Sequence, residues 1–329
     1  MGNPRPTETV IALKELQKVY QPNRRRQSGE VKALAGISLE VLRGEFFGLL
    51  GPNGAGKTTT VGILTTRVLP TGGSALIDGI DVVRDSVTIK RRIGVVAQAN
   101  NLDRSLTARE NLLFHAEYFG VSKQERERRA DELLAHFQLT ERANEKTDGY
   151  SGGMAQRLKI ARALMHAPSI LFLDEPTAGL DPQARRTLWE LLRELNQNGQ
   201  TIFLTTHNMD EADQLCGRVA IMDKGKLLAV NTPAALKQEV PGGYLIELRG
   251  RAPEAVAVTL AAQMRALPGV ADVTVSDDLF RLYAGHAEGL LAQAMHLASQ
   301  QGVMITYAHV AEPSLENLFL HLTGRSLEQ

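Results

Sequence analysis

The sequence predicts an α/β protein with a mostly parallel sheet, followed by a smaller α+β unit. Three observations support this prediction. Short apolar runs alternate with helical stretches over the first two thirds of the chain, which is typical of a parallel sheet buried on both faces. A glycine-rich turn at residues 51–56 directly follows the first of these runs. After about residue 240 the pattern changes to short alternating strands and amphipathic helices.

The expected strands of the parallel sheet are five apolar runs. They lie at residues 46–50, 93–96, 170–173, 201–204 and 219–222. Because each run is apolar along its length, we expect helices to cover both faces of the sheet.

A charged, helix-rich segment at about residues 100–162 is expected to form a helical subdomain. Thr107 and Glu110 have the capping-box spacing, which predicts that a helix begins there. The charges at residues 123–134 have helical spacing and indicate a solvated helix face. Three arginines at residues 24–26, in contrast, lie among polar and glycine residues and indicate an exposed loop.

The pattern changes near residue 240, where we place a domain boundary between residues 1–240 and 241–329. Strand and helix patterns then alternate in six segments, at residues 244–248, 257–267, 273–275, 279–283, 287–299 and 303–307. The order strand, helix, strand, strand, helix, strand is that of a ferredoxin-like α+β unit.

The composition is that of an ordinary folded protein. The chain has 329 residues, is 43% hydrophobic and 22% charged, and has 37 basic and 37 acidic residues. This excludes wholesale disorder and any overall field that would attract nucleic acid. The single Cys216 excludes an internal disulfide. With neither a signal-peptide core nor a long apolar run, we expect a cytoplasmic protein without membrane-spanning helices.

A phosphate-binding loop is indicated by GPNGAGKT at residues 51–58, which matches G-x-x-x-x-G-K-[ST] without a gap. Its glycines let backbone N–H groups point at phosphate oxygens, and the following helix directs its positive end at them. Lys57 is expected to bind the β- and γ-phosphates, and the Thr58 hydroxyl to coordinate Mg²⁺.

Two adjacent carboxylates, Asp174 and Glu175, follow the apolar run at residues 170–173. Beside a phosphate loop, they indicate a cation ligand and a proton acceptor rather than two acids that merely end a strand. Asp174 is expected to hold Mg²⁺ through water. Glu175 is expected to act as the general base for the water that attacks the γ-phosphate.

The segment YSGGM at residues 150–154 resembles the LSGGQ signature of ATP-binding cassette (ABC) ATPases. Tyr150 and Met154 replace the usual Leu and Gln, so only the backbone role of the signature carries over. Ser151, Gly152 and Gly153 are expected to start a helix whose N–H groups meet a γ-phosphate.

Other motifs of the family occur in order between about residues 10 and 228. Tyr20 resembles the aromatic residue that stacks on adenine, and Gln98 the Q-loop glutamine. Asp181 resembles the D-loop aspartate, and His207 the switch histidine.

The resemblance implies roles for these residues with ATP and Mg²⁺. The catalytic residues are Glu175, His207, Gln98 and Lys57, and the metal ligands are Thr58, Gln98 and Asp174. The nucleotide-binding residues are Tyr20, Gly51, Pro52, Asn53, Gly54, Ala55, Gly56, Lys57, Thr58, Thr59, Ser151, Gly152, Gly153 and Asp181. The signature of one copy closes over the nucleotide held by another, which implies a dimer, simplest as a homodimer, with two composite sites.

The branch of the family is indicated by the signature and by the tail EPSLENLFLHLTGR at residues 312–325. Both are similar to drug- and antibiotic-exporter ATPases of the daunorubicin-resistance type. This implies an ATP-hydrolysing subunit on the cytoplasmic face of the membrane. It would drive efflux of a drug-like or lipid-like substrate through a separate ABC-2 type transmembrane permease, with no nucleic-acid partner.

Other classes of ABC ATPase fit less well. A soluble ABC ATPase of translation usually carries two cassettes, and a chromosome-maintenance ATPase has long heptads between the residues that correspond to Lys57 and Asp174. A purely regulatory cassette usually lacks Glu175 or His207. A soluble role in translation or regulation stays the alternative, and the absence of a neighbouring permease gene would favour it.

Overall fold

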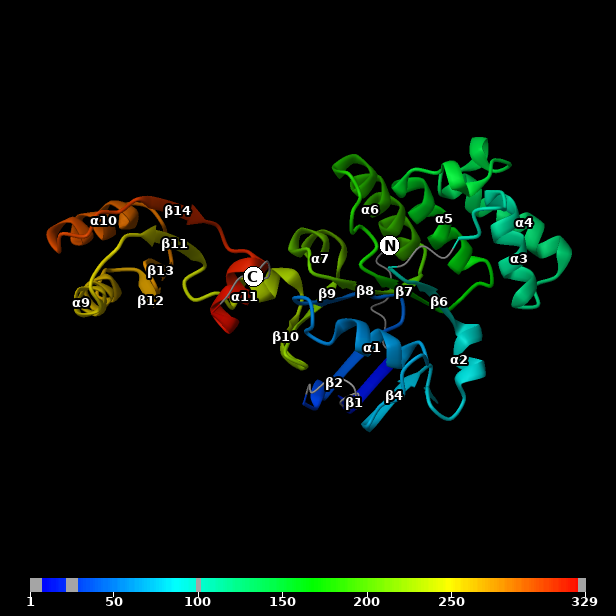
Figure 1. The fold of residues 1–329 in the computed structure, drawn as a ribbon, viewed down its shortest axis with the longest axis horizontal. Coiled ribbons are helices and arrows are strands. Elements are labelled where there is room, and N and C mark those ends of the chain that lie inside the picture. The colour runs from blue at the N-terminus through cyan, green and yellow to red at the C-terminus, as the bar shows by residue number, and fades with distance from the viewer. Residues whose placement is uncertain (1–7, 22–28, 99–101, 325–329) are drawn as a thin grey trace. The chain divides into compact units, whose positions relative to one another are not determined.

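The computed structural model describes residues 8–21, 29–98 and 102–324, and the chain divides into two compact units, residues 1–230 and 231–329 (Figure 1). The division falls after residue 230, whereas the sequence predicted it after residue 240. The reason is that α8 (Pro233–Gln238) contacts α11 (Leu315–Thr323), the last helix of the second unit. The arginines at residues 24–26 lie outside the described residues.

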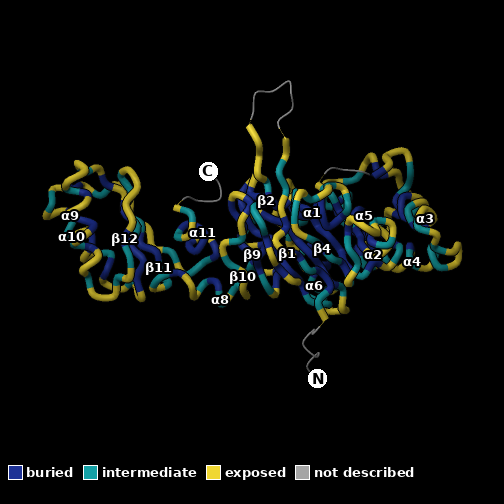
Figure 2. The backbone as a smooth tube through the Cα atoms, turned by 90° about the horizontal axis from the view of Figure 1, so that it is seen from below, coloured by how far each residue is buried: buried dark blue, intermediate teal, exposed yellow. Residues whose placement is uncertain are grey.

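A six-stranded sheet forms the centre of the first unit, in the order β10-β9-β3-β8-β7-β6. The pairs from β9 through β6 are all parallel. Every residue of β3, β7 and β8 is buried, and Figure 2 shows similar burial along β9. This confirms the five strands predicted from apolar runs. Their bounds, with β10, are β3 Phe46–Leu50, β6 Ile93–Val96, β7 Ile170–Asp174, β8 Thr201–Thr206, β9 Arg218–Asp223 and β10 Lys226–Asn231.

A second, antiparallel sheet was not predicted. Its order is β2-β1-β4-β5, with bounds β1 Thr9–Tyr20, β2 Val31–Leu42, β4 Gly72–Ile77 and β5 Ile80–Asp81. Helix α1 (Lys57–Leu64) contacts β2 and β4 of this sheet and β7 of the parallel sheet. One apolar core therefore joins both sheets through α1, and it includes Ile11, Val61 and Phe172.

Three helices, α3 (Ala108–Tyr118), α4 (Lys123–His136) and α5 (Gly152–Leu164), pack against one another and form the helical subdomain (Figure 1). Thr107 and Glu110 form the predicted capping box at the start of α3. Besides α1, the other α-helices that the structure describes in this unit are α2 (Ser86–Arg92), α6 (Pro182–Gln197) and α7 (Met209–Leu215). Among the helices that the structure describes, none has both the length and the apolar character needed to span a bilayer.

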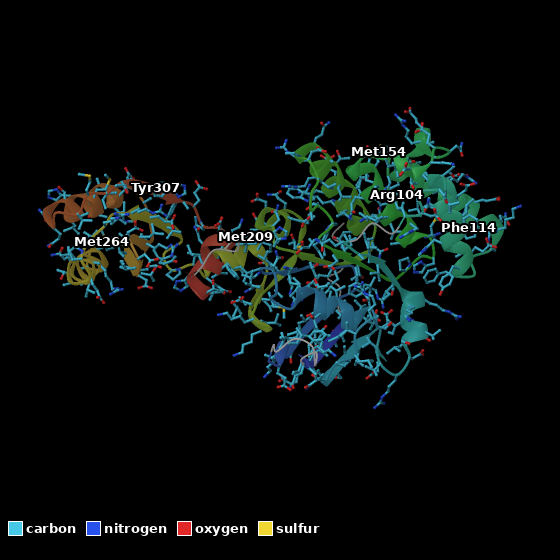
Figure 3. All side chains as sticks on the ribbon, viewed as in Figure 1. Arg104, Phe114, Met154, Met209, Met264 and Tyr307 are labelled. Carbon is cyan, nitrogen blue, oxygen red and sulfur yellow. The ribbon has the colours of Figure 1, made fainter. Side chains whose placement is uncertain are left out.

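The second unit has a four-stranded sheet in the order β12-β13-β11-β14, with every pair antiparallel. Its elements are α8, β11 Tyr244–Arg249, α9 Glu254–Arg265, β12 Val270–Ser276, β13 Leu279–Ala284, α10 Leu290–Gln300, β14 Tyr307–Ala311 and α11. The predicted order of strands and helices from β11 to β14 is present, although the last strand begins at Tyr307 rather than near residue 303. Ile246, Phe280 and Met264 of α9 (Figure 3) belong to its core.

Candidate nucleotide-binding site

The phosphate loop connects β3 to α1, and its glycines allow a close approach of the backbone. A Cβ atom on Gly51 would lie 2.2 Å from the carbonyl oxygen of Met222. Gly56 has φ +112°, and a Cβ there would lie 2.6 Å from the carbonyl oxygen of Ala33. Only glycine fits at these two positions. Since α1 begins at Lys57 directly after the loop, its N-terminal N–H groups face the space above the loop.

Lys57 is buried at the base of this loop, with 4% of its surface exposed. Its Nζ donates hydrogen bonds to the carbonyl oxygens of Gly51 (2.6 Å) and Pro52 (3.1 Å), and it lies 3.5 Å from Glu175 Oε1. Burial lowers the pKa of Lys57, and the carboxylates of Glu175 and Asp174 oppose this shift. An entering phosphate would stabilise the same ammonium group.

The two predicted carboxylates have different surroundings. Asp174 is buried at the end of β7, where its Oδ1 accepts a hydrogen bond from Thr205 Oγ1 (2.6 Å). Glu175 has a left-handed backbone with φ +50°, an unfavourable conformation for a residue with a side chain. Its backbone N–H donates to the carbonyl oxygen of Thr205 (3.0 Å). The adjacent strand therefore supports this strained position.

His207 lies at the end of β8, and its Nδ1 is 3.2 Å from Glu175 Oε2. The Glu175 carboxylate therefore lies between the Lys57 ammonium and the His207 ring. Asn208, the residue after His207, fixes the backbone there through two hydrogen bonds. Its N–H donates to Thr206 Oγ1 (2.9 Å), and its side chain accepts from the N–H of Glu211 (3.0 Å) at the start of α7.

These groups line a cavity of about 850 Å³, within the range of small-molecule sites. The predicted residues that line it are Tyr20, Pro52, Asn53, Gly54, Gly56, Lys57, Thr58, Thr59, Gln98, Glu175 and His207. Gly51 and Ala55 belong to the same loop without lining the cavity, and Asp174 lies behind it in β7. The sequence analysis did not predict Lys32, Thr177, Arg185, Glu211 and Lys224, which also line it.

The proposed ligands of Mg²⁺ offer the chemistry that this ion prefers. Thr58 and Gln98 line the cavity, and Asp174 is close enough to Lys57 for its charge to oppose the lowering of the Lys57 pKa by burial. Hydroxyl, amide and carboxylate oxygens are hard donors that suit Mg²⁺. The residues present therefore fit this ion.

The signature residues lie elsewhere. Ser151 caps α5 by accepting a hydrogen bond from the N–H of Met154 (3.2 Å), a residue labelled in Figure 3. Ser151, Gly153, Met154 and Asp181 line a separate hollow of about 240 Å³, and none of them lines the nucleotide cavity. Gly152 begins α5 beside them. Within one chain, the structure therefore does not bring the signature to the phosphate loop.

Comparisons with known proteins point to one family. The family model described as ABC transporter matches residues 34–178. The chain is 37% identical to the linearmycin resistance ATP-binding protein LnrL of Bacillus subtilis, over 93% of this chain and 98% of that protein. It is 40% identical to the Nod factor export ATP-binding protein I of Paraburkholderia xenovorans, over 98% and 99%. It is also 40% identical to the daunorubicin resistance ATP-binding protein DrrA2 of Streptomyces coeruleorubidus, over 92% and 94%.

Two solved structures resemble the fold. One is a dimeric post-hydrolysis state of the ATP-binding cassette MJ0796 bound to ADP and Pi, with a TM-score of 0.61 and 33% identity. It covers 68% of this chain and 98% of that one. The other is cbiO1 from Clostridium perfringens, part of the ABC transporter complex cbiONQ, with a TM-score of 0.63 and 28% identity. It covers 70% of this chain and 92% of that one.

Proposed function

The chain belongs to the ABC transporter family of ATP-binding proteins, and from this we propose that it is the ATP-hydrolysing subunit of a drug exporter. The observation that carries the proposed ATP hydrolysis is the contact of Glu175 with both Lys57 and His207 beside a phosphate loop. The relatives named for linearmycin resistance, daunorubicin resistance and Nod factor export favour a drug-like or lipid-like cargo.

Hydrolysis joins the oxygen of water to the γ-phosphorus and breaks the bond to the bridging oxygen of ADP. Glu175 accepts the proton of the attacking water, and its contact with His207 keeps the carboxylate directed at the cavity. Lys57 neutralises negative charge on the β- and γ-phosphates. Tyr20, at the cavity wall, stacks on the adenine ring. Thr58, Gln98 and Asp174 would hold Mg²⁺, which would supply further charge neutralisation when bound.

A dimer completes each site. The hollow at Ser151, Gly153 and Asp181 is separate from the nucleotide cavity of the same chain, which favours a role toward a second copy. The N-terminal end of α5 would then meet the γ-phosphate held by the partner. A homodimer satisfies this with one kind of chain, since each copy has one phosphate loop and one signature.

The partner in the membrane would be a permease of the ABC-2 type, which places this subunit on the cytoplasmic face. The second unit would stabilise the dimer or contact the permease. Its strand order β12-β13-β11-β14, with antiparallel pairs, favours a ferredoxin-like arrangement.

Co-purification followed by transport tests the export proposal. A tagged chain is isolated from solubilised membranes, the associated membrane protein is identified, and both are reconstituted in vesicles with daunorubicin as the probe. We expect ATP-dependent accumulation that the variant Lys57→Ala abolishes. ATP hydrolysis without any associated membrane protein would instead support a soluble role in translation or regulation.

A further inference from the structure

A buried carboxylate on α7 borders the nucleotide cavity, and the mechanism above does not use it. Glu211 is only 1% exposed and lines the cavity. Burial raises the pKa of this carboxyl, and its hydrogen bonds and the charge of Arg185 oppose the shift. A buried acid is costly unless hydrogen bonds compensate for the lost water. The hydrogen bonds of Glu211 therefore indicate its role.

The side chain of Glu211 connects two other elements. Its Oε1 accepts a hydrogen bond from Thr177 Oγ1 (2.9 Å) and another from Trp189 Nε1 of α6 (3.3 Å). Thr177 belongs to the loop of residues 175–181, which begins at the proposed base and ends at Asp181, the N-cap of α6. This loop therefore borders the nucleotide cavity at one end and the signature hollow at the other.

The backbone of Glu211 connects to the switch segment, residues 206–208. Its N–H donates to Asn208 Oδ1 (3.0 Å), next to His207 in the chain. The main chain of Glu211 is thus hydrogen-bonded to the segment that carries His207. Its side chain is hydrogen-bonded to the loop that carries Glu175. Glu175 and His207 themselves meet at 3.2 Å.

We propose that Glu211 is a positioning residue that, through Thr177, holds the loop of residues 175–181 against the switch segment. The bond is buried, where a hydrogen bond is stronger than in water. It keeps Glu175 and His207 in contact, and it connects that pair to Asp181 on the side proposed to meet the second copy. This inference rests on the proposed ATPase function, and it makes Glu211 one of the residues that set the rate of ATP hydrolysis.

A double-mutant cycle tests this proposal. Thr177→Val removes the donor with little change of shape, and Glu211→Met removes the acceptor. We expect each variant to lower kcat for ATP about tenfold, equivalent to about 1.4 kcal/mol, with little change in KM. Because both changes break the same bond, the double variant should also be about tenfold slower rather than a hundredfold.

Conservative and control variants separate positioning from stability. Glu211→Gln keeps an oxygen that accepts from Thr177, so its kcat should stay within about threefold of the wild type. If Glu211→Met does not fold, Thr177→Val and Glu211→Gln decide the question. Asp210→Asn, an exposed neighbour on the same helix, should leave kcat unchanged. All rates are expressed per bound nucleotide, so that a loss of folded protein alone does not lower them.

Three results would overturn the inference. They are a wild-type kcat in Thr177→Val, additive losses in the double variant, and an equal loss in Asp210→Asn. In each case the wild type still hydrolyses ATP, so the proposed function survives. A wild-type chain that hydrolyses no ATP, alone or with its permease, would overturn the proposed function and this inference together.

Discussion

Replacement of Glu175 by glutamine should stop hydrolysis without stopping ATP binding. The amide keeps the shape of the side chain and a contact with His207, but it cannot accept the proton of the attacking water. Loss of a general base typically costs about 10²–10⁴-fold in rate, which corresponds to roughly 3–5 kcal/mol of transition-state stabilisation. We expect kcat of Glu175→Gln to fall within that range.

The contacts of Lys57 indicate why binding should survive. Glu175 Oε1 lies 3.5 Å from Lys57 Nζ and opposes the lowering of the Lys57 pKa by burial. Without this carboxylate, the ammonium loses one partner in the free protein, but the phosphates of ATP replace it. Lys57 also keeps its hydrogen bonds to the phosphate loop. The affinity for ATP should therefore stay similar or increase.

The assays are phosphate release, equilibrium binding of ATP, and size-exclusion chromatography with and without ATP. The variant should bind ATP, release little phosphate and persist as an ATP-dependent dimer. Glu190→Gln, an exposed carboxylate on α6, is the matched control and should behave as the wild type. Turnover of Glu175→Gln within a few-fold of the wild type would refute the assignment of Glu175 as the base.

Three further predictions concern the composite site, the second unit and pH. Lys57→Ala and Ser151→Arg should each inactivate a homodimer, whereas a mixture of the two should recover nucleotide trapping at one intact site per mixed dimer; no recovery would argue against facing motifs. A chain that ends at residue 231 should fold and bind ATP in a calorimetric titration. A chain that ends near Lys237 would keep α8 without its contact with α11, so the end at residue 231 is preferable. Burial, with the charges of Arg162 and His166, lowers the pKa of His115 from 6.5 to about 4. The unfolded chain therefore takes up this proton first as the pH falls, and the free energy of unfolding should drop by up to about 3 kcal/mol between pH 6.5 and 4. Denaturant unfolding at several pH values should show a smaller drop in His115→Phe; an equal drop would exclude His115 as the cause.

The phosphate loop, the buried strands and the first helix of the helical subdomain could be predicted because each has its pattern in one continuous stretch of sequence. The phosphate loop at residues 51–58 encodes a backbone shape with its glycines, and apolar runs such as β7 encode burial by composition alone. The capping box at Thr107 works over one helical turn. In each case the pattern itself lies within one short segment of the chain.

Features that depend on distant segments could not be predicted. The antiparallel sheet was missed because β1 and β2 do not alternate regularly. Register shifts interrupt their pairing, and Glu15 has φ +45° within β1. The division after residue 230 depends on the contact of α8 with α11, two helices that a four-stranded sheet separates in the chain.

The same distinction applies to the site. Motifs in the sequence predicted Lys57, Glu175 and His207 as site residues, because each belongs to a recognisable pattern within a few positions of the chain. Nothing local distinguishes Glu211 from the other acids of α7. Only the packing of α6 and α7 brings its carboxylate to Thr177, 34 positions earlier in the chain. Tertiary structure also decided that the signature lines a hollow of its own, since α5 packs on α6 with Gly153 close to Ala184.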